Sequence, residues 1–325
     1  MNKFLKKACS ISVALLLLGS VLLIVGSWLG GKMIFSYTPG ENVITNRDID
    51  VEMVTKEVDS FKAINVENDD FDVKIINGDN YSVTYPTGEN LNSSYKIDGD
   101  TLNVSVKGKN KFGINISIAD FTDENPDDHS IVVTVPEKTD LDSITVITQD
   151  GDCAVDSQTA DTYNLTLYCG DLSVTNSKGK TFKLKNSEGD ISINDTTLKT
   201  LSGKLSDGDA TISNSNLDKI NIELSEGDFT LSDSVAKHIN NKQLDGDFTL
   251  SYCETENLDS KLYEGDFTAK FEDGETNYST NLSAEDGDIY FAGDDKGTKF
   301  QSKNSSKKSI TASVLDGDIT VEFGE

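Results

Sequence analysis

Short runs of alternating apolar and polar residues recur along the second half of the chain every 19 residues. The stretch GDATISNSNLDKINIELSEGDFTLSDS, residues 208–234, contains one phrase twice: Gly-Asp, a short alternating run, a small polar turn, one apolar residue and a longer alternating run. Alternation with a period of two is typical of a β-strand with one buried face. Each unit therefore predicts two strands and two turns.

The Gly-Asp pairs keep this 19-residue interval from Gly151 to Gly265, and two more follow at Gly287 and Gly317 after longer steps. A unit this short cannot enclose a core, but successive units can stack and pair backbone with backbone. We therefore expect an all-β fold, a single-stranded parallel β-solenoid (β-helix) of 19-residue coils. With about 4.8 Å between coils, the nine Gly-Asp coils would extend over roughly 40 Å.

Residues one period apart should share an environment in such a stack. The apolar positions predict two interior columns, one containing Ile191, Ala210, Phe229 and Phe248, the other containing Phe182, Leu201, Ile220, Ile239 and Leu258.

The Gly-Asp pairs predict corners. Glycine lacks a Cβ and can take the positive φ that such corners often need, and the following Asp can accept a backbone N–H bond. The structural corner residues are Gly151, Gly170, Gly189, Gly208, Gly227, Gly246, Gly265, Gly287 and Gly317.

The chain divides into five expected regions: residues 1–7, a cytoplasmic stub; 8–31, a transmembrane anchor; 32–60, a connector; 61–147, irregular β coils that cap the solenoid; and 148–325, the regular repeat. Irregular end coils commonly cover the open core of a solenoid. Two insertions look like surface excursions: residues 107–129, and the lysine-rich stretch from Lys296 to Ser309, expected to be a mobile loop.

The amino end predicts a single transmembrane helix. Lys3, Lys6 and Lys7 precede an uncharged stretch of 24 residues, enough to span a bilayer, and this charge favours a cytoplasmic amino terminus. A cleaved signal peptide is the alternative, although no Ala-x-Ala site follows. Cys9 lacks the apolar residues of a lipobox before it.

The formal net charge of −27 indicates that the exported part is strongly acidic. Such a surface repels nucleic acid, so no nucleic-acid partner is expected, and attracts cations and basic peptides. Arg47 is the single arginine, which argues against bidentate recognition of phosphate.

Calcium is the one cofactor that the corners suggest. Stacked coils would align carboxylates that repel one another, and calcium, which prefers several oxygen ligands, would relieve that repulsion. The alternative is a row of hydrogen-bonded corner carboxylates that point to water, which we favour because the GGxGxDxUx calcium repeat is absent. The candidate ligands are Asp152, Asp171, Asp190, Asp209, Asp228, Asp247 and Asp266.

Nothing in the motifs points to an enzyme. His129 and His238 are far apart and in no metal-ligand spacing, no GxSxG or P-loop string occurs, and no break in the repeat is evident where unlike polar residues would converge. Cys153, Cys169 and Cys253 occupy different repeat positions, so we expect small buried or corner residues and no bridge. We therefore expect no catalytic site.

The segment VPEKTDLDSITVITQDGDCAVDS, residues 135–157, together with the Gly-Asp units and the anchor, resembles the bacterial DUF4097 family of adhesin-type proteins, similar to LiaG and YvlB-type envelope proteins. The resemblance covers residues from about 61 to 325. It implies a non-enzymatic, single-pass protein of the bacterial cell membrane, whose β domain lies outside and meets an extracellular protein, a cationic peptide or a cell-wall partner. The alternative is an envelope-stress accessory protein that binds cationic peptides through its acidic face.

Overall fold

The structure of the chain is a computed structural model that describes residues 51–108, 129–305 and 307–324, and the backbone of 34–37 and 114–117. The chain forms two compact units, one of residues 1–50 and 109–128, the other of Val51–Gly108 and His129–Glu325. In the first unit, strands β1 (Ile34–Tyr37) and β8 (Ile114–Ser117) pair antiparallel.

The expected cytoplasmic stub and transmembrane anchor lie outside the described residues. Within those residues no helix has the length and apolarity that a membrane span requires, and the only helix found among them is the 3-10 turn η1 (Glu275–Asn277).

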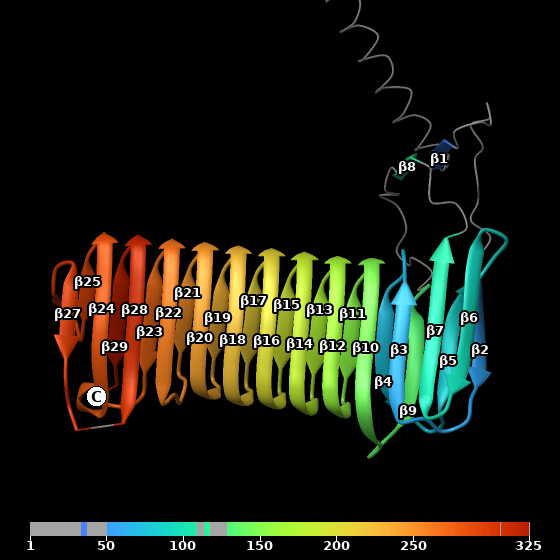
Figure 1. The fold of residues 1–325 in the computed structure, drawn as a ribbon, viewed down its shortest axis with the longest axis horizontal. Coiled ribbons are helices and arrows are strands. Elements are labelled where there is room, and N and C mark those ends of the chain that lie inside the picture. The colour runs from blue at the N-terminus through green and yellow to red at the C-terminus, as the bar shows by residue number, and fades with distance from the viewer. Residues whose placement is uncertain (1–33, 38–50, 109–113, 118–128, 306, 325) are drawn as a thin grey trace, which may run out of the picture. The chain divides into compact units, whose positions relative to one another are not determined.

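The second unit consists of two large sheets in which most strands run parallel (Figure 1). Each regular coil contributes a long strand to one sheet, turns at the Gly-Asp corner, contributes a short strand to the other sheet, and turns again. The 13-stranded sheet contains β3 (Ala63–Asn68), β6 (Leu91–Asp98), β7 (Thr101–Gly108), β10 (Asp140–Asp150), β12 (Thr159–Cys169), β14 (Lys178–Glu188), β16 (Thr197–Asp207), β18 (Asn216–Glu226), β20 (Val235–Asp245), β22 (Asn257–Glu264), β24 (Tyr278–Asp286), β27 (Lys299–Ser302) and β28 (Lys308–Asp316). The 14-stranded sheet contains β2 (Glu52–Glu57), β4 (Val73–Gly78), β5 (Ser82–Thr87), β9 (Ile131–Pro136), β11 (Cys153–Asp156), β13 (Leu172–Thr175), β15 (Ile191–Asn194), β17 (Ala210–Ser213), β19 (Phe229–Ser232), β21 (Phe248–Ser251), β23 (Phe267–Phe271), β25 (Ile289–Phe291), β26 (Asp294–Asp295) and β29 (Ile319–Phe323).

The register of the regular coils confirms the 19-residue repeat. Ile191 pairs with Ala210, Ala210 with Phe229, and Phe229 with Phe248, so the first predicted column is continuous. The second column, from Phe182 to Leu258, is continuous in the same way. These side chains are almost fully buried. The apolar residues of the alternating sequence are therefore the ones that point into the core.

Aromatic stacking extends the core along one column. The ring centroids of Phe229 and Phe248 are 5.5 Å apart, and those of Phe248 and Phe267 are 5.0 Å apart with ring planes only 3° from parallel. A parallel register brings identical side chains into contact on successive coils, so Phe229 and Phe248 pack at a tilt and Phe248 and Phe267 pack face to face.

The last coils do not stack in sequence order, contrary to the simple succession of coils from Gly151 to Gly317. Strand β28 pairs with β22 on one side and with β24 on the other, and β29 lies between β23 and β25 in the same manner. The carboxyl-terminal coil is therefore inserted between two coils that precede it in the chain (Figure 1).

The end strands give a physical reason for this order. After β25 the chain returns antiparallel as β26 and then β27, which pair with the outer edges of β25 and β24. These return strands occupy the edge on which a further coil would stack, so the coil that carries them has to be terminal. The prediction that residues 296–309 form a mobile loop was wrong for residues 299–302, which are β27, and for residues 308–309, which begin β28.

The amino-terminal end of the second unit shows a similar exchange. The coil of β3 and β4 lies between the coil of β7 and β9 and that of β10 and β11. Antiparallel strands β6, β5 and β2 follow at this end. Strand β2 falls within the range expected to be a connector, and residues 109–128 of the expected excursion belong to the first unit.

Candidate functional site

The Gly-Asp corners are positions where two coils approach closely. At Gly208 the φ angle is +129°, and a Cβ atom would lie 2.2 Å from the carbonyl oxygen of Gly189. Gly287 does not have a positive φ, yet a Cβ there would lie 2.1 Å from the oxygen of Gly317. Positive φ therefore holds for the other eight corner glycines, whereas close approach of the backbone explains Gly287 as well.

The corner aspartates form a hydrogen-bonded ladder. The backbone N–H of Asp209 donates to Oδ1 of Asp190 at 2.9 Å, and the N–H of Asp228 donates to Oδ1 of Asp209 at 2.8 Å. The ladder continues through Asp318 to Asp288, in the exchanged order of the last coils. The seven candidate calcium ligands, Asp152, Asp171, Asp190, Asp209, Asp228, Asp247 and Asp266, all use Oδ1 in this way.

Each of these carboxylates therefore already uses one oxygen as the acceptor of a backbone hydrogen bond. In the described part of the chain, no group of three or more His, Cys, Asp or Glu side chains is arranged to hold a metal ion. Calcium binding stays a prediction, and comparing the melting temperature with and without millimolar calcium at constant ionic strength tests it.

The opposite corner carries a second ladder that the sequence analysis missed. Asn214 takes a left-handed conformation with φ 49°, and the next residue, Ser215, is buried. The backbone N–H of Ser215 donates to Oγ of Ser234 at 3.0 Å, and Ser215 Oγ donates to the carbonyl of Ser213 at 2.7 Å. A signal was present, because Asn or Asp recurs every 19 residues here and these residues tolerate positive φ.

The surface of the second unit is not uniformly acidic, because carboxylates and lysines gather in different places. Carboxylates lie on both sides of the corner glycines, whereas the outer face of the long-strand sheet carries lysines. Some of these are paired: Lys180 with Asp161 and Lys204 with Glu223, both at 2.7 Å. The lysines of β14, β16, β18, β20 and β22 on this face are Lys178, Lys180, Lys183, Lys185, Lys199, Lys204, Lys219, Lys237, Lys242 and Lys261.

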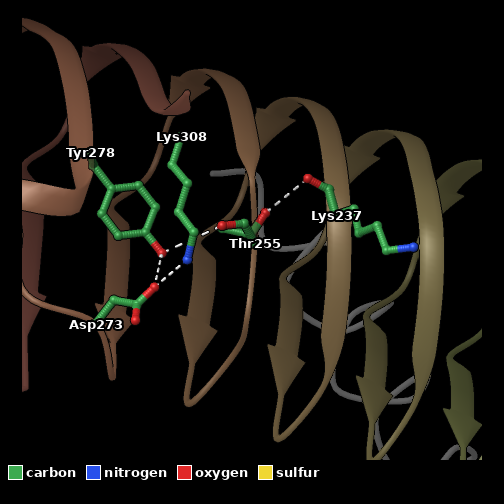
Figure 2. A network of polar contacts seen from close by, with 5 residues as sticks. All are labelled: Lys237, Thr255, Asp273, Tyr278 and Lys308. Atoms are coloured by element: carbon green, nitrogen blue, oxygen red, sulfur yellow. Dashed lines mark hydrogen bonds and ion pairs between the residues drawn. The ribbon is translucent and has the colours of Figure 1, made fainter. Parts of the chain in front are cut away.

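A polar network fastens the inserted coil at the point where β28 begins (Figure 2). The hydroxyl of Tyr278 lies 3.4 Å from Oδ2 of Asp273 and 3.4 Å from the carbonyl oxygen of Thr255, while the ammonium of Lys308 binds the same carboxylate oxygen. Burial, and then the charge of Asp273, raises the pKa of Tyr278, so the phenol stays protonated and donates. The network joins segments before β22, after β23 and at the starts of β24 and β28. The contacts among Thr255, Asp273, Tyr278 and Lys308 therefore hold these segments together, and we call this network the clamp.

Two surface grooves accompany these features. One of about 640 Å³ runs beside the aspartate ladder over β4, β11, β13, β15 and β17, with Ala154 and Ser173 among its lining residues. The other, of about 230 Å³, lies on the outer face of the long-strand sheet and contains His238.

The three cysteines in the described part of the chain, Cys153, Cys169 and Cys253, do not provide a reactive thiol. Burial raises the pKa of Cys153 to about 12 and that of Cys253 to about 11. Cys169 is half-exposed, and desolvation together with nearby Glu188 raises the pKa of its thiol. Thiols with raised pKa values are poor nucleophiles at neutral pH.

A comparison with protein families gives one match over most of the second unit. The pattern of the family called Toastrack DUF4097 matches residues 61–322. The chain belongs to the Toastrack DUF4097 family. The match begins just before β3 and ends within β29, so it includes the exchanged coils at both ends.

Solved structures with a similar fold include three from Parabacteroides and Bacteroides species. A candidate lipid-binding protein from Parabacteroides distasonis is 16% identical, with a TM-score of 0.50, and the match covers 84% of this chain and 97% of that one. A candidate adhesin from Parabacteroides merdae is 14% identical, with a TM-score of 0.48 and coverage of 86% and 98%. A candidate adhesin from Bacteroides fragilis is also 14% identical, with a TM-score of 0.44 and coverage of 84% and 97%. No curated protein matches the chain.

Proposed function

We propose that the protein is a non-enzymatic, membrane-anchored surface scaffold, an adhesin or interaction protein of the bacterial envelope. Residues 8–31 would anchor it with the amino terminus in the cytoplasm, and the β-solenoid would lie outside the cell. The observation that supports this most is the aspartate ladder, because its carboxylates are held at one position of every regular coil.

A second column of carboxylates runs along the same Gly-Asp corner and adds to its negative charge. On the other side of the corner glycines, Asp207 pairs with Glu226, Glu226 with Asp245, and Asp245 with Glu264. Neighbouring strands lie about 4.8 Å apart, so carboxylates of like charge follow one another closely. A partner with basic residues would relieve this repulsion over several coils at once, and rigid presentation lowers the entropy cost of binding.

Binding of a fluorescent chain lacking residues 1–31 to isolated bacterial envelopes tests this function. We expect saturable binding that weakens as NaCl is raised. Replacement of Asp190, Asp209 and Asp228 by Asn should weaken it at least fivefold. A matched variant with Asn at Asp79, Asp140 and Asp142 should bind like the unchanged chain. Absence of binding by the unchanged chain, or equal loss in both variants, would contradict the proposal.

The second candidate is an envelope-stress accessory protein that binds cationic peptides through the same two columns. Attraction of lysine-rich chains to a row of carboxylates favours it. An octalysine peptide that binds the chain while envelopes do not would decide for this candidate. The lipid binding named for the Parabacteroides distasonis protein finds less support here, because an acidic edge repels anionic headgroups.

A further inference from the structure

The smaller groove marks a break in the surface pattern of the repeat. On the outer face of the long-strand sheet, one column contains only hydroxyl side chains on β10, β12, β14 and β16: Ser143, Thr162, Thr181 and Thr200. From β18 onward the same column contains four unlike polar residues, which lie on neighbouring strands: Lys219, His238, Asn257 and Ser309. The groove of about 230 Å³ lies at this break.

A second column forms the other side of the groove. It consists of Asn240, Asp259 and Thr311, two residues further along β20, β22 and β28. All three side chains are exposed or half-exposed, so their hydrogen-bonding groups face the groove and the solvent. Unlike polar residues from two neighbouring columns therefore line one groove.

Three of the groove residues are held by hydrogen bonds across three strands. Ser309 Oγ donates to Oδ1 of Asn257 at 2.9 Å, and Nδ2 of Asn257 donates to Nδ1 of His238 at 3.0 Å. In this orientation of the amide, the oxygen accepts from the hydroxyl and the nitrogen is the donor toward the imidazole. Nδ1 of His238 then accepts, which is the role it has in the tautomer that carries the proton on Nε2, a donor.

This network speaks against hydrolytic chemistry at the groove. A nucleophilic serine gives its proton to a histidine, whereas Ser309 gives it to a side-chain amide. The groove is suited to binding.

Two of the groove residues come from the inserted carboxyl-terminal coil. Ser309 and Thr311 lie on the inserted strand β28, and they pair with Asn257 and Asp259 of β22. In a stack that followed the sequence, β24 would occupy this place. The clamp formed by Lys308 and Asp273 lies at the start of the same strand and holds it in position (Figure 2).

We propose that this groove binds a neutral, hydroxyl-rich saccharide unit. Amides, hydroxyls and the Nε2–H of His238 supply alternating donors and acceptors, which is the pattern that adjacent sugar hydroxyls require. Lys219 and Asp259 carry opposite charges, so the groove has no preference for an ionic ligand. The volume is below the ~300–1,000 Å³ of pockets for drug-sized ligands. It therefore suits a single unit of a longer chain. This inference deepens the proposed surface function and rests on it for the source of the saccharide.

Histidine resonances provide a direct test, because the chain has two histidines. His129 precedes β9, seven strands from β21 of the His238 coil in the sheet order, and is a built-in control. The full chain, labelled with ¹³C at histidine and held in a detergent without a sugar headgroup, would be titrated with chitotetraose and with maltotetraose. We expect at least one of them to shift the His238 signals saturably at millimolar concentration and to leave those of His129 unchanged.

Two variants should weaken this binding at least fivefold: Asn257→Ala, which removes the centre of the network, and Asp259→Ala, which leaves it intact. Asn164→Ala, at the repeat position of Asn240 on the distant strand β12, should bind like the unchanged chain. Three results would overturn the proposal: no shift with either saccharide at 50 mM, equal shifts of both histidines, or a shift with glycerol 3-phosphate and none with saccharides. These outcomes leave the envelope-binding assay unaffected, because it depends on the aspartate ladder.

Discussion

A single carbonyl contact explains why the corner position accepts only glycine. The Cβ that any other residue would add at Gly208 lies 2.2 Å from Gly189 O, at a positive φ that L-residues rarely adopt. Gly208→Ala should therefore lower the free energy of unfolding by at least ~2 kcal/mol, measured by urea denaturation.

Gly203 is the matched control for this substitution. It lies within strand β16 without a positive φ, and the nearest atom to an added Cβ is Ile222 Cγ1 at 3.4 Å, an ordinary contact. Gly203→Ala should leave the stability unchanged or raise it by up to ~1 kcal/mol. Equal destabilisation by both substitutions would contradict the close approach of coils at the corner.

The contribution of the aspartate ladder to stability can be separated into the effect of its hydrogen bonds and the effect of its charges. Asp209→Ala removes the acceptor for the backbone N–H of Asp228, which should cost about 1 kcal/mol of stability. Asp209→Asn retains an acceptor oxygen and removes one of a row of like charges, so we expect a change within ~0.5 kcal/mol. Thermal unfolding of both variants checks this. Equal loss with Asn and with Ala would mean that the charge, which both variants remove, is the dominant effect, for example through a bound cation.

At the level of the strand, pairing on both sides explains how the carboxyl-terminal coil stabilises its neighbours. The N–H of Phe267 donates to Asp318 O at 2.9 Å, and the N–H of Ile319 donates to Asp288 O at 3.0 Å. Removal of residues 305–325 should therefore expose the facing edges of β22 and β24 and speed the hydrogen exchange of β22–β25. Strands β14–β17 of the same molecule should keep their protection. Unchanged protection of β24 would show that it pairs with β22 directly, against the inserted order.

The strands themselves were predictable, because parallel stacking gives every nineteenth residue the same surroundings and Phe229 and Phe248 report this directly. The exchanged order of the last two coils was not predictable, because the inward faces of β24 and β28 are similarly apolar and either strand could follow β22. The return strands β26 and β27 decide the order, and the polar stretch that contains β27 suggested a loop. The groove residues Ser309 and Thr311 were missed for the same reason, because their neighbours follow from the order of coils.

In the second unit as a whole, the distance between two residues at the same repeat position depends on the number of coils that separate them. The outward residues Ser173, Thr268, Thr320 and Tyr290 share one repeat position on short strands, and the register places them in that spatial order. A solenoid therefore predicts that separations along this face grow by a constant step of about 4.8 Å per coil. The two columns of carboxylates and the groove that contains His238 both depend on this regular spacing.

Electron-electron distance measurements between spin labels test that claim most directly. One label would be placed at Ser173 and the second at Thr268, Thr320 or Tyr290, in a chain whose native cysteines are replaced by alanine. The structure predicts separations of about 24, 29 and 34 Å, for five, six and seven coil steps. A shorter distance to position 290 than to position 320, or distances that do not increase along this series, would contradict the inserted solenoid.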